Sequence, residues 1–470
     1  MSARSLRLIS PFRCQFNLNS AKMIESGEEF NTFLDRFNRD FRTARQSLFP
    51  KVPQGVDIEA MLHQQKADSK SPRYIELNKA GSLFNSPKYL SISFNSTLHA
   101  DINKYLQEAA QTADSLCGYV LSDKLSPVWE NADIAIYCYT IALFTLDVSI
   151  GDKFGNDDWN KVDEWTTHFV FHLLNCLYKD YIFPALCGVN DYADHCSEKR
   201  VRSPRDYVVF YDLSNRECNP SSTSTLWVNR TLICPPGNMP DNWGLHNTNT
   251  SSVIEVNKTR IHLGWGNNVI ETTHTDYARD LSPVWQSMCL AQYYYAVLDV
   301  TAKNLKRFVG STYDKKSNRA LRELSQAMDA VVNTVTIFQI EYKDLSMELQ
   351  GLTKEVFNRL EKTWDFETVF KNVQGKCDLC KSNVERMSAD MSQRNNVRVE
   401  MVLTTMTGLG FVNLMISISW FGRVLLKEGY QSDIVGLLDV GQKLSPSAMV
   451  WIGVWLAILV ITFVAANRLR

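Results

Sequence analysis

One predicted helix places three potential metal ligands on a single face. Glu164, His168 and His172 are spaced four residues apart, so their side chains lie above one another on a helix. Carboxylate and imidazole groups are common ligands of Zn²⁺ and related cations, which makes this helix a candidate metal site. The alternative is that the histidines pack among the large apolar residues of the same segment.

A basic segment supplies candidate phosphate ligands. Four cations lie in the seven residues 199–205, among them Arg200, Arg202 and Arg205. Guanidinium groups match phosphate oxygens in geometry, whereas a solvated surface loop is the alternative explanation of the same residues.

An aromatic turn follows a predicted strand over residues 260–265. Trp265, Asn267 and Asn268 stand there beside two glycines. An indole ring can stack on a planar base while amide groups bond to the edge of that base. Together with the basic segment, the turn predicts a pocket for a nucleotide-like anion, with a tight asparagine-rich turn as the alternative.

Residue patterns typical of enzymes are missing from the sequence. It contains no nucleophile elbow, no P-loop and no paired-glycine dinucleotide motif. Its 50 Lys and Arg residues balance 51 Asp and Glu residues, so neither sign dominates. We therefore expect a protein that is not an enzyme and does not bind DNA or RNA directly.

Two long apolar segments lie in the last 70 residues. Residues 401–421 and 446–466 contain no charged side chain, and the second segment carries Trp451 and Trp455 near one end. At about 1.5 Å per residue, each segment is long enough to cross the roughly 30 Å hydrocarbon core of a bilayer. We predict two membrane-spanning helices.

Basic residues around these spans predict their orientation. Arg386, Arg394 and Arg398 precede the first span, Arg468 and Arg470 follow the second, and the segment between them has no positive excess. The positive-inside rule then places both termini in the cytoplasm. The eleven cysteines are an odd number and do not show the clustered spacing of a disulfide-bonded domain. The first residues have no apolar stretch of the kind found in a signal peptide. Both features predict a cytosolic globular part with reduced thiols.

A long helical stalk is expected before the spans. Apolar residues recur every three or four positions from Leu321 to Val356, which predicts packing on other helices of the chain or on other copies of it. We expect a break at Gly375 and a polar helix from there into the first span.

The first 315 residues predict a mixture of helices and strands. The pentapeptide Leu-Ser-Pro-Val-Trp occurs twice, at 125–129 and 281–285, and predicts the start of a helix at each place. The repetition has two explanations, an internal duplication or chance. The apolar run 134–146 is too short to span a membrane and predicts a buried helix. The expected elements are a helix capped by Ser26 and Glu29, a linker over 50–72, helices over 98–117, 131–149 and 159–181, and strands over 90–94, 207–211, 226–228, 253–256 and 260–265.

The predicted fold is an α+β domain followed by a helical stalk and a two-helix transmembrane hairpin. Its parts are a cytosolic sensor domain (1–315), a stalk (316–400), the first span (401–421), an outer loop (422–445), the second span (446–466) and a basic cytosolic tail (467–470).

This organisation resembles the CorA magnesium-transporter superfamily, most closely from about residue 316 onward. Members form oligomers, typically pentamers, whose first span lines a cation pore. The resemblance implies a homo-oligomeric, multi-pass plasma-membrane channel or transporter for Mg²⁺ or another divalent cation, gated by its cytosolic domain, with the transported ion as its only cofactor. The family motif Gly-Met-Asn is absent from the end of the first span, where residues 419–423 read Ser-Trp-Phe-Gly-Arg, and the outer loop is longer than in the family.

Four residues are the predicted pore lining. Gly410, Asn413 and Ser417 share a face of the first span, and Arg398 lies close to that face at its inner end. An asparagine inside a membrane is unfavourable unless it faces protein or water. The alternative is that Asn413 joins two packed helices.

Two further functions are compatible with the sequence. Divergent CorA-like proteins with enlarged cytosolic domains occur beside type III CRISPR systems, where they are antiviral membrane effectors activated by a nucleotide second messenger. The predicted nucleotide pocket fits such an effector. The other alternative is a membrane-tethered binding or scaffold protein whose spans serve as an anchor.

Overall fold

The structure of the chain, a computed structural model, forms two compact units. These are Met1–Lys315 with Gln326–Lys381, and Lys316–Ser325 with Ser382–Arg470. The described residues are 4–14, 16–18, 28–62, 88–137, 139–197, 208–210, 224–240, 243, 253–256, 258–274, 277–311, 318–427 and 444–469.

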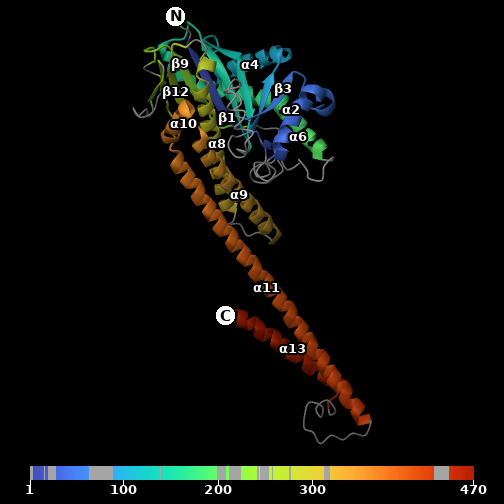
Figure 1. Cartoon of the computed structure of the whole chain (residues 1–470). Helices are drawn as coiled ribbons and strands as arrows, with labels where there is room; N and C mark the ends of the chain where they lie inside the picture. Colours follow the sequence, from blue (N-terminus) through green and yellow to red (C-terminus); the bar gives the residue numbers. More distant parts are fainter. Residues whose placement is uncertain are drawn as a thin grey trace. The chain divides into compact units, whose positions relative to one another are not determined.

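A mixed ten-stranded sheet is the centre of the first unit (Figure 1). Its order is β10-β11-β12-β9-β1-β6-β5-β4-β3, with β8 paired to β1. The described pairs are antiparallel, apart from the parallel pair β9 and β12. The strands are β1 (Ser5–Arg13), β3 (Val56–Leu62), β4 (Lys88–Phe94), β5 (Leu125–Ile136), β6 (Ile141–Ile150), β8 (Ser224–Thr225), β9 (Asn229–Cys234), β10 (Val253–Val256), β11 (Thr259–His262) and β12 (Asn267–Glu271). A separate pair joins β2 (Phe16–Leu18) to β7 (Val208–Phe210).

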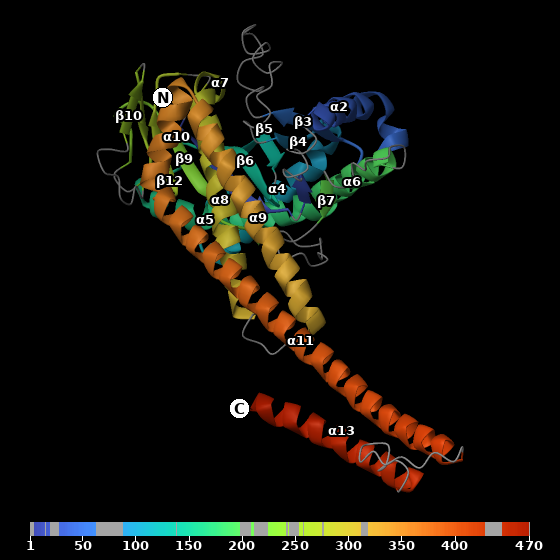
Figure 2. The same ribbon diagram turned by 60° about the horizontal axis from the view of Figure 1, so that its bottom comes forward.

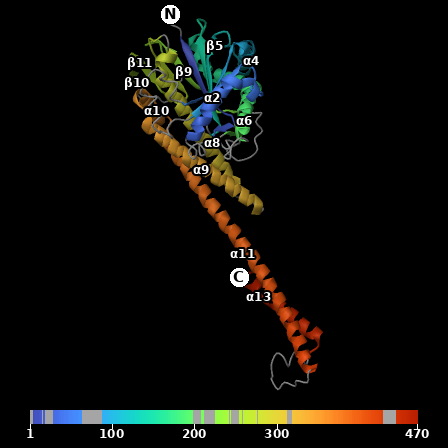
Figure 3. The ribbon, with the colours of Figure 1, turned by 45° about the vertical axis from the view of Figure 1, so that its right-hand side comes forward.

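Helices cover both faces of the sheet, as Figures 2 and 3 show from two sides. On β1, Phe12 packs edge-on against Tyr178, which follows α5, while the guanidinium of Arg7 lies 4.4 Å from the ring centroid of Trp285 in α8. Alternate side chains of this strand therefore contact different helices, as expected of a strand buried on both faces. The helices are α2 (Glu28–Leu48), α4 (His99–Cys117), α5 (Val162–Leu177), α6 (Phe183–Ser197), α7 (Tyr277–Asp280), α8 (Ser282–Ser311), α9 (Asn318–Glu348), α10 (Gly351–Thr363) and α11 (Phe366–Lys427).

The predicted helix over residues 131–149 is wrong, because these residues form the β5–β6 hairpin. Ile136 pairs with Ala142, and the turn between the strands holds Tyr139 and Thr140 at φ values of 60° and 64°. Both faces of the hairpin are covered, so its apolar residues run almost without interruption. The two-residue alternation that identifies a half-exposed strand is therefore missing from the sequence.

The repeated pentapeptide takes two different conformations. Residues 125–129 open a strand, in which Pro127 pairs with Val148, whereas 281–285 lead into α8. Pro283 lies in the first turn of α8, where a backbone N–H would have no acceptor within the helix, so the missing N–H of proline costs no hydrogen bond. The surroundings select the conformation, so the shared letters do not correspond to a duplicated structural element.

Most other predicted elements of the first unit are confirmed within a few residues. They are the helices α4 and α5 and the strands β4, β7, β10 and β11. Residues 226–228 instead connect β8 to β9, and the predicted linker over 50–72 contains β3. Ser26 lies outside the described residues, and the aromatic face of α2 is buried at Phe33, Phe37 and Phe41.

From Met328 onward, the apolar repeat of the predicted stalk packs within the first unit. The rings of Phe338 and Tyr342 on α9 lie 5.3 and 5.0 Å from the ring of Tyr294 on α8. The repeat is interrupted at Gln350, which is extended between α9 and α10. Intramolecular helix packing therefore accounts for these apolar positions.

The expected break at Gly375 is wrong, because this glycine lies inside α11. The helices change direction instead at Asp365, whose φ of 50° ends α10 and precedes the first residue of α11. The predicted polar helix leading into the apolar segment is confirmed, since α11 continues to Lys427.

Unit two contains the apolar part of α11 and the helix α13 (Pro446–Leu469). α11 is long and apolar enough to cross a membrane, and few residues of its apolar part are buried, whereas the described apolar part of α13, Ser447–Leu459, is shorter. A Cβ atom built on Gly453 would lie 3.2 Å from the Cα atom of Val412, so the two helices approach closely there. A glycine allows such an approach between helices.

Two helical glycines give opposite predictions for the first unit. A Cβ atom at Gly188 in α6 would lie 2.5 Å from Cγ2 of Val52, whereas one at Gly310 in α8 would meet nothing within 4 Å. We expect Gly188→Ala to lower the free energy of unfolding by about 1–3 kcal/mol, because the core there must shift. Gly310→Ala is the matched control and has no such clash, so helix propensity makes it neutral or stabilising by up to about 1 kcal/mol. Urea unfolding followed by tryptophan fluorescence measures both, and equal effects would contradict the packing of α6.

Candidate functional site

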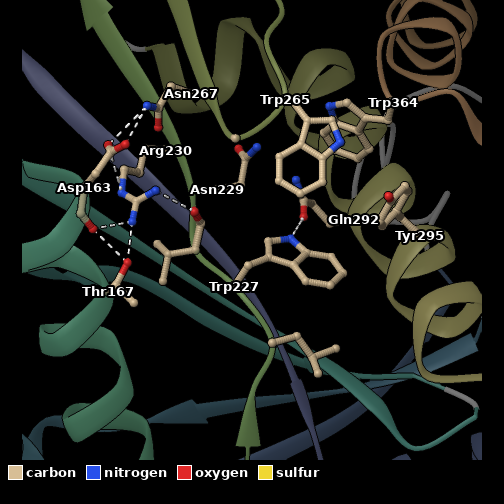
Figure 4. A pocket seen from close by; sticks show the side chains of 13 residues that line it. Asp163, Thr167, Trp227, Asn229, Arg230, Trp265, Asn267, Gln292, Tyr295 and Trp364 are labelled. Atoms are coloured by element: carbon tan, nitrogen blue, oxygen red, sulfur yellow. Dashed lines mark hydrogen bonds and ion pairs between the residues drawn. The ribbon is translucent and has the colours of Figure 1, made fainter. Parts of the chain in front are cut away.

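A cavity of about 400 Å³ lies beside the first residues of β9 in the first unit (Figure 4). Its walls come from α5, the β8–β9 connection, the turn before β12, α8 and the residue that follows α10. We call it the aromatic pocket, and its volume falls in the range of about 300–1,000 Å³ typical of small-molecule sites. Its lining residues are Asp163, Thr167, Leu226, Trp227, Val228, Asn229, Arg230, Trp265, Gly266, Asn267, Gln292, Tyr295 and Trp364.

Three tryptophans surround one tyrosine in this pocket. The ring centroid of Tyr295 lies 5.7 Å from that of Trp227, 6.3 Å from Trp265 and 5.9 Å from Trp364, and each pair of rings is nearly perpendicular. Edge-to-face packing of this kind is favourable by about 0.5–1.5 kcal/mol per pair. Trp265 is 61% exposed, so a flat indole face remains accessible to a ligand.

Hydrogen bonds hold two of the indole rings in place. Nε1 of Trp227 donates to Oε1 of Gln292 at 2.5 Å, and Nε1 of Trp364 donates to the carbonyl of Gly264 at 2.9 Å. Burial raises the pKa of the Tyr295 phenol and outweighs its hydrogen bond with Trp265, which lowers that pKa. The aromatic wall is thus uncharged at neutral pH and largely fixed before a ligand arrives.

A buried arginine forms the polar side of the pocket. Arg230, the second residue of β9, is 7% exposed. Its Nε donates to Oγ1 of Thr166 at 2.6 Å and one terminal nitrogen donates to the carbonyl of Val228 at 2.9 Å. The other terminal nitrogen donates to the carbonyl of Asp163 and to Oγ1 of Thr167. One side chain thereby joins α5 to β9.

The charge of Arg230 is balanced inside the protein. Burial lowers the pKa of its guanidinium, and the carboxylate of Asp163, 3.5 Å from Nε, opposes this change. An arginine keeps its charge in such surroundings because its ordinary pKa is so high. Since the N–H groups are directed at protein acceptors, they cannot form a free two-pronged contact with a phosphate.

The two predicted asparagines have different roles. Nδ2 of Asn267 lies 3.0 and 3.1 Å from the carboxylate oxygens of Asp163, at the pocket wall. Asn268 is 0% exposed, and its Oδ1 accepts a bond from the amide of Gly264 while its Nδ2 donates to Oδ1 of Asn229. Asn268 therefore shapes the turn from beneath, whereas Trp265 and Asn267 face the pocket, as Figure 4 shows for those two.

The predicted phosphate ligands cannot be placed. Arg200, Arg202 and Arg205 lie outside the described residues. Four further lining residues were not predicted, because the pocket brings them together from distant segments: Arg230, Trp227, Tyr295 and Trp364. One signal was available for Arg230, namely a single cation close to the apolar residues 232–234.

The structure brings two of the three predicted metal ligands together with a cysteine. Ligand atoms of Cys117, Glu164 and His168 lie within 4.8 Å of one another, and His172 is not part of this group. The hydroxyl of Tyr119 also donates to Oε2 of Glu164 at 3.2 Å. Burial raises the pKa of the Cys117 thiol, which disfavours the thiolate that a metal requires.

A second cavity of about 430 Å³ lies between β1, β5 and α8. Arg7 on its wall donates to both carboxylate oxygens of Asp147, at 2.6 and 2.8 Å, and stacks on Trp285. Nδ2 of Asn131 bonds to the same carboxylate at 3.0 Å. The polar groups named here are engaged with one another, which favours a structural role for this charge pair.

The four predicted pore residues are exposed on α11. Gly410, Asn413 and Ser417 are all accessible, and so is Arg398. The hydroxyl of Ser417 donates to the carbonyl of Asn413, one turn earlier.

Comparisons of the chain with protein-family models, with curated proteins and with solved structures found no match.

Arg230→Met tests whether the buried arginine holds the pocket together. The change leaves the carbonyls of Asp163 and Val228 without their donor, so we expect the free energy of unfolding to fall by about 3 kcal/mol. Arg260→Met on β11 is the matched control, because Arg260 pairs with Glu255 at the surface and such a pair contributes less than about 1 kcal/mol. Urea unfolding of the full chain in detergent gives both values, and similar losses would show that Arg230 does not join α5 to β9.

Proposed function

We propose that the chain is a homo-oligomeric membrane channel or transporter with two spans, in which one face of the first span lines the ion pathway. The observation that carries this proposal is the exposed polar face of α11 at Gly410, Asn413 and Ser417. The resemblance to CorA proteins adds Mg²⁺ or another divalent cation as the transported ion, and a plasma membrane as the location.

The two helices of the second unit use a different face of α11 for their contact. Gly408, Met415 and Ser419 on α11 are buried, and they lie on the side where Val412 meets Gly453 of α13. At 100° per residue, this side of the helix is nearly opposite to that of Asn413. Among the described residues, Asn413 therefore lies outside the contact that α11 makes with Gly453.

An exposed amide inside a membrane requires a partner, and the structure gives the side chain of Asn413 no partner among the described residues. Lipid offers no hydrogen bond, so a polar group that faces lipid is unfavourable, and such residues usually face protein or water. The hydroxyl groups of Thr404 and Thr405 form their hydrogen bonds within α11, because each donates to a backbone carbonyl one turn earlier. A primary amide cannot complete its bonds in this way, which favours a pore or another copy of α11 beside Asn413.

The charges near the inner end of the span support a gated pathway. Arg398 is exposed less than one helical turn before Met401, the first residue of the span. A ring of arginines from several copies would repel a divalent cation until it moved or was neutralised. We propose that both termini lie in the cytoplasm, as the positive-inside rule predicts.

A membrane-tethered scaffold is the competing function. In a tether the spans need neither a polar face nor a defined number of copies. Ion flux into proteoliposomes distinguishes the two, because a tether carries no ion.

Asn413→Leu tests the pore assignment. We expect normal assembly, measured as the mass of the detergent-solubilised complex, together with a changed rate or selectivity of divalent-cation flux in proteoliposomes. Thr404→Val is the matched control: it also removes a polar group from the span, but one that already bonds to its own helix, so flux stays unchanged. A monomeric wild-type protein, or unchanged flux in Asn413→Leu, would contradict the proposal.

A further inference from the structure

We infer that the aromatic pocket binds a planar nitrogen heterocycle of nucleobase size, neutral or cationic, and that its occupancy stabilises the start of α11. This inference concerns the first unit and does not depend on ion transport.

The shape of the pocket selects a flat ligand. The indole of Trp265 is 61% exposed, and the rings of Tyr295 and Trp364 stand close by, all in the lining of one cavity of about 400 Å³. A planar ring gains most from such a wall because it contacts an indole across its whole face, and every nucleobase offers that face.

The polar side selects a ligand with N–H donors. Asp163 lines the pocket with a half-exposed carboxylate, and Asn267 holds that carboxylate through its Nδ2. Carboxylate oxygens accept several hydrogen bonds, so amino or imino groups on a ring can bind there. A cavity lined by the acceptor Asp163 and by the aromatic wall can stack a heterocycle and accept hydrogen bonds from its edge.

The same residues disfavour a phosphate as the main contact. Arg230 is the cation among the described residues of the lining, and four of its five N–H groups donate to Thr166, Thr167 and two backbone carbonyls. Asp163 adds a negative charge at the accessible end. The base, and not the phosphate of a nucleotide, is therefore what this pocket recognises.

The pocket wall continues directly into α11. Trp364 lines the cavity, Asp365 follows at a φ of 50°, and Phe366 is the first residue of the helix. The ring of Phe366 lies 5.5 Å from that of Tyr295 and 6.2 Å from that of Trp364. A ligand that stacks in the pocket adds contacts to Trp364 and Tyr295, and so makes the opening of the residues packed on them, at the beginning of α11, less frequent.

Titration of the full chain in detergent tests the binding site. Adenosine and guanosine are the probes, with their 5′-monophosphates and choline for comparison, and affinity is measured by calorimetry and by quenching of tryptophan fluorescence. We expect at least one nucleoside to bind, its monophosphate to bind within about threefold of it, and choline not to bind. Trp265→Ala removes the stacking face and is expected to weaken binding about tenfold. Asp163→Asn, which keeps the shape but loses the charged acceptor, has a similar expected effect.

Trp451→Ala is the matched control, because Trp451 is an exposed tryptophan on α13 in the other unit. It leaves the affinity unchanged. Absence of binding by both nucleosides, equal affinity in Trp265→Ala, or binding by the monophosphates alone would overturn the inference. Binding of choline in place of the nucleosides would assign the wall to a quaternary ammonium ligand and would also overturn it.

Hydrogen exchange tests the second half of the inference. A bound nucleoside is expected to slow amide exchange over residues 366–381 as well as in α5 and β9, with no change in β3. Protection confined to α5 and β9 would show that occupancy of the pocket does not reach α11.

Discussion

The burial of one guanidinium group determines how the aromatic pocket is built. Arg230 enters the protein from β9 and donates to side chains and a carbonyl of α5, and also to the carbonyl of Val228 just before its own strand. A buried cation requires such partners, because an unpaired charge in the interior is strongly unfavourable. Satisfying it fixes the start of α5, the start of β9 and the connection that carries Trp227. The lining of the pocket is largely a consequence of that requirement.

Aromatic packing extends this arrangement from the pocket to the helical region. Tyr295 of α8 contacts Trp227, Trp265, Trp364 and Phe366, so one ring links the sheet, the turn before β12 and the beginning of α11. α11 is a single helix from Phe366 to Lys427. Its first turns belong to a tightly packed core, while its apolar part is exposed.

The second unit separates two kinds of contact on one helix. Val412 and Met415 of α11 face Gly453 of α13, and Asn413 is exposed on another part of the helix surface. Both patterns are expected of a helix in a membrane, where close approach uses small residues and polar groups avoid lipid. The assembly of several chains that we propose would place a second copy or water beside Asn413.

The sequence alone determined what depends on local composition and spacing. The absence of charge over 401–421 predicts a membrane-spanning helix, and the periodic helices α4 and α5 were found because each shows its own pattern within a few turns. Even Trp265 and Asn267 were recognisable as possible ligand contacts from their residue types. The tertiary structure decided the rest: that Asn268 lies beneath the turn, that Cys117 and not His172 joins Glu164 and His168, and that residues 131–149 are strands. These outcomes depend on partners far away in the chain, such as α8 covering β6 or α5 accepting the bonds of Arg230. A local pattern cannot show them, because burial on both faces removes the alternation that marks a strand, and because a pocket exists only once its distant walls have packed together.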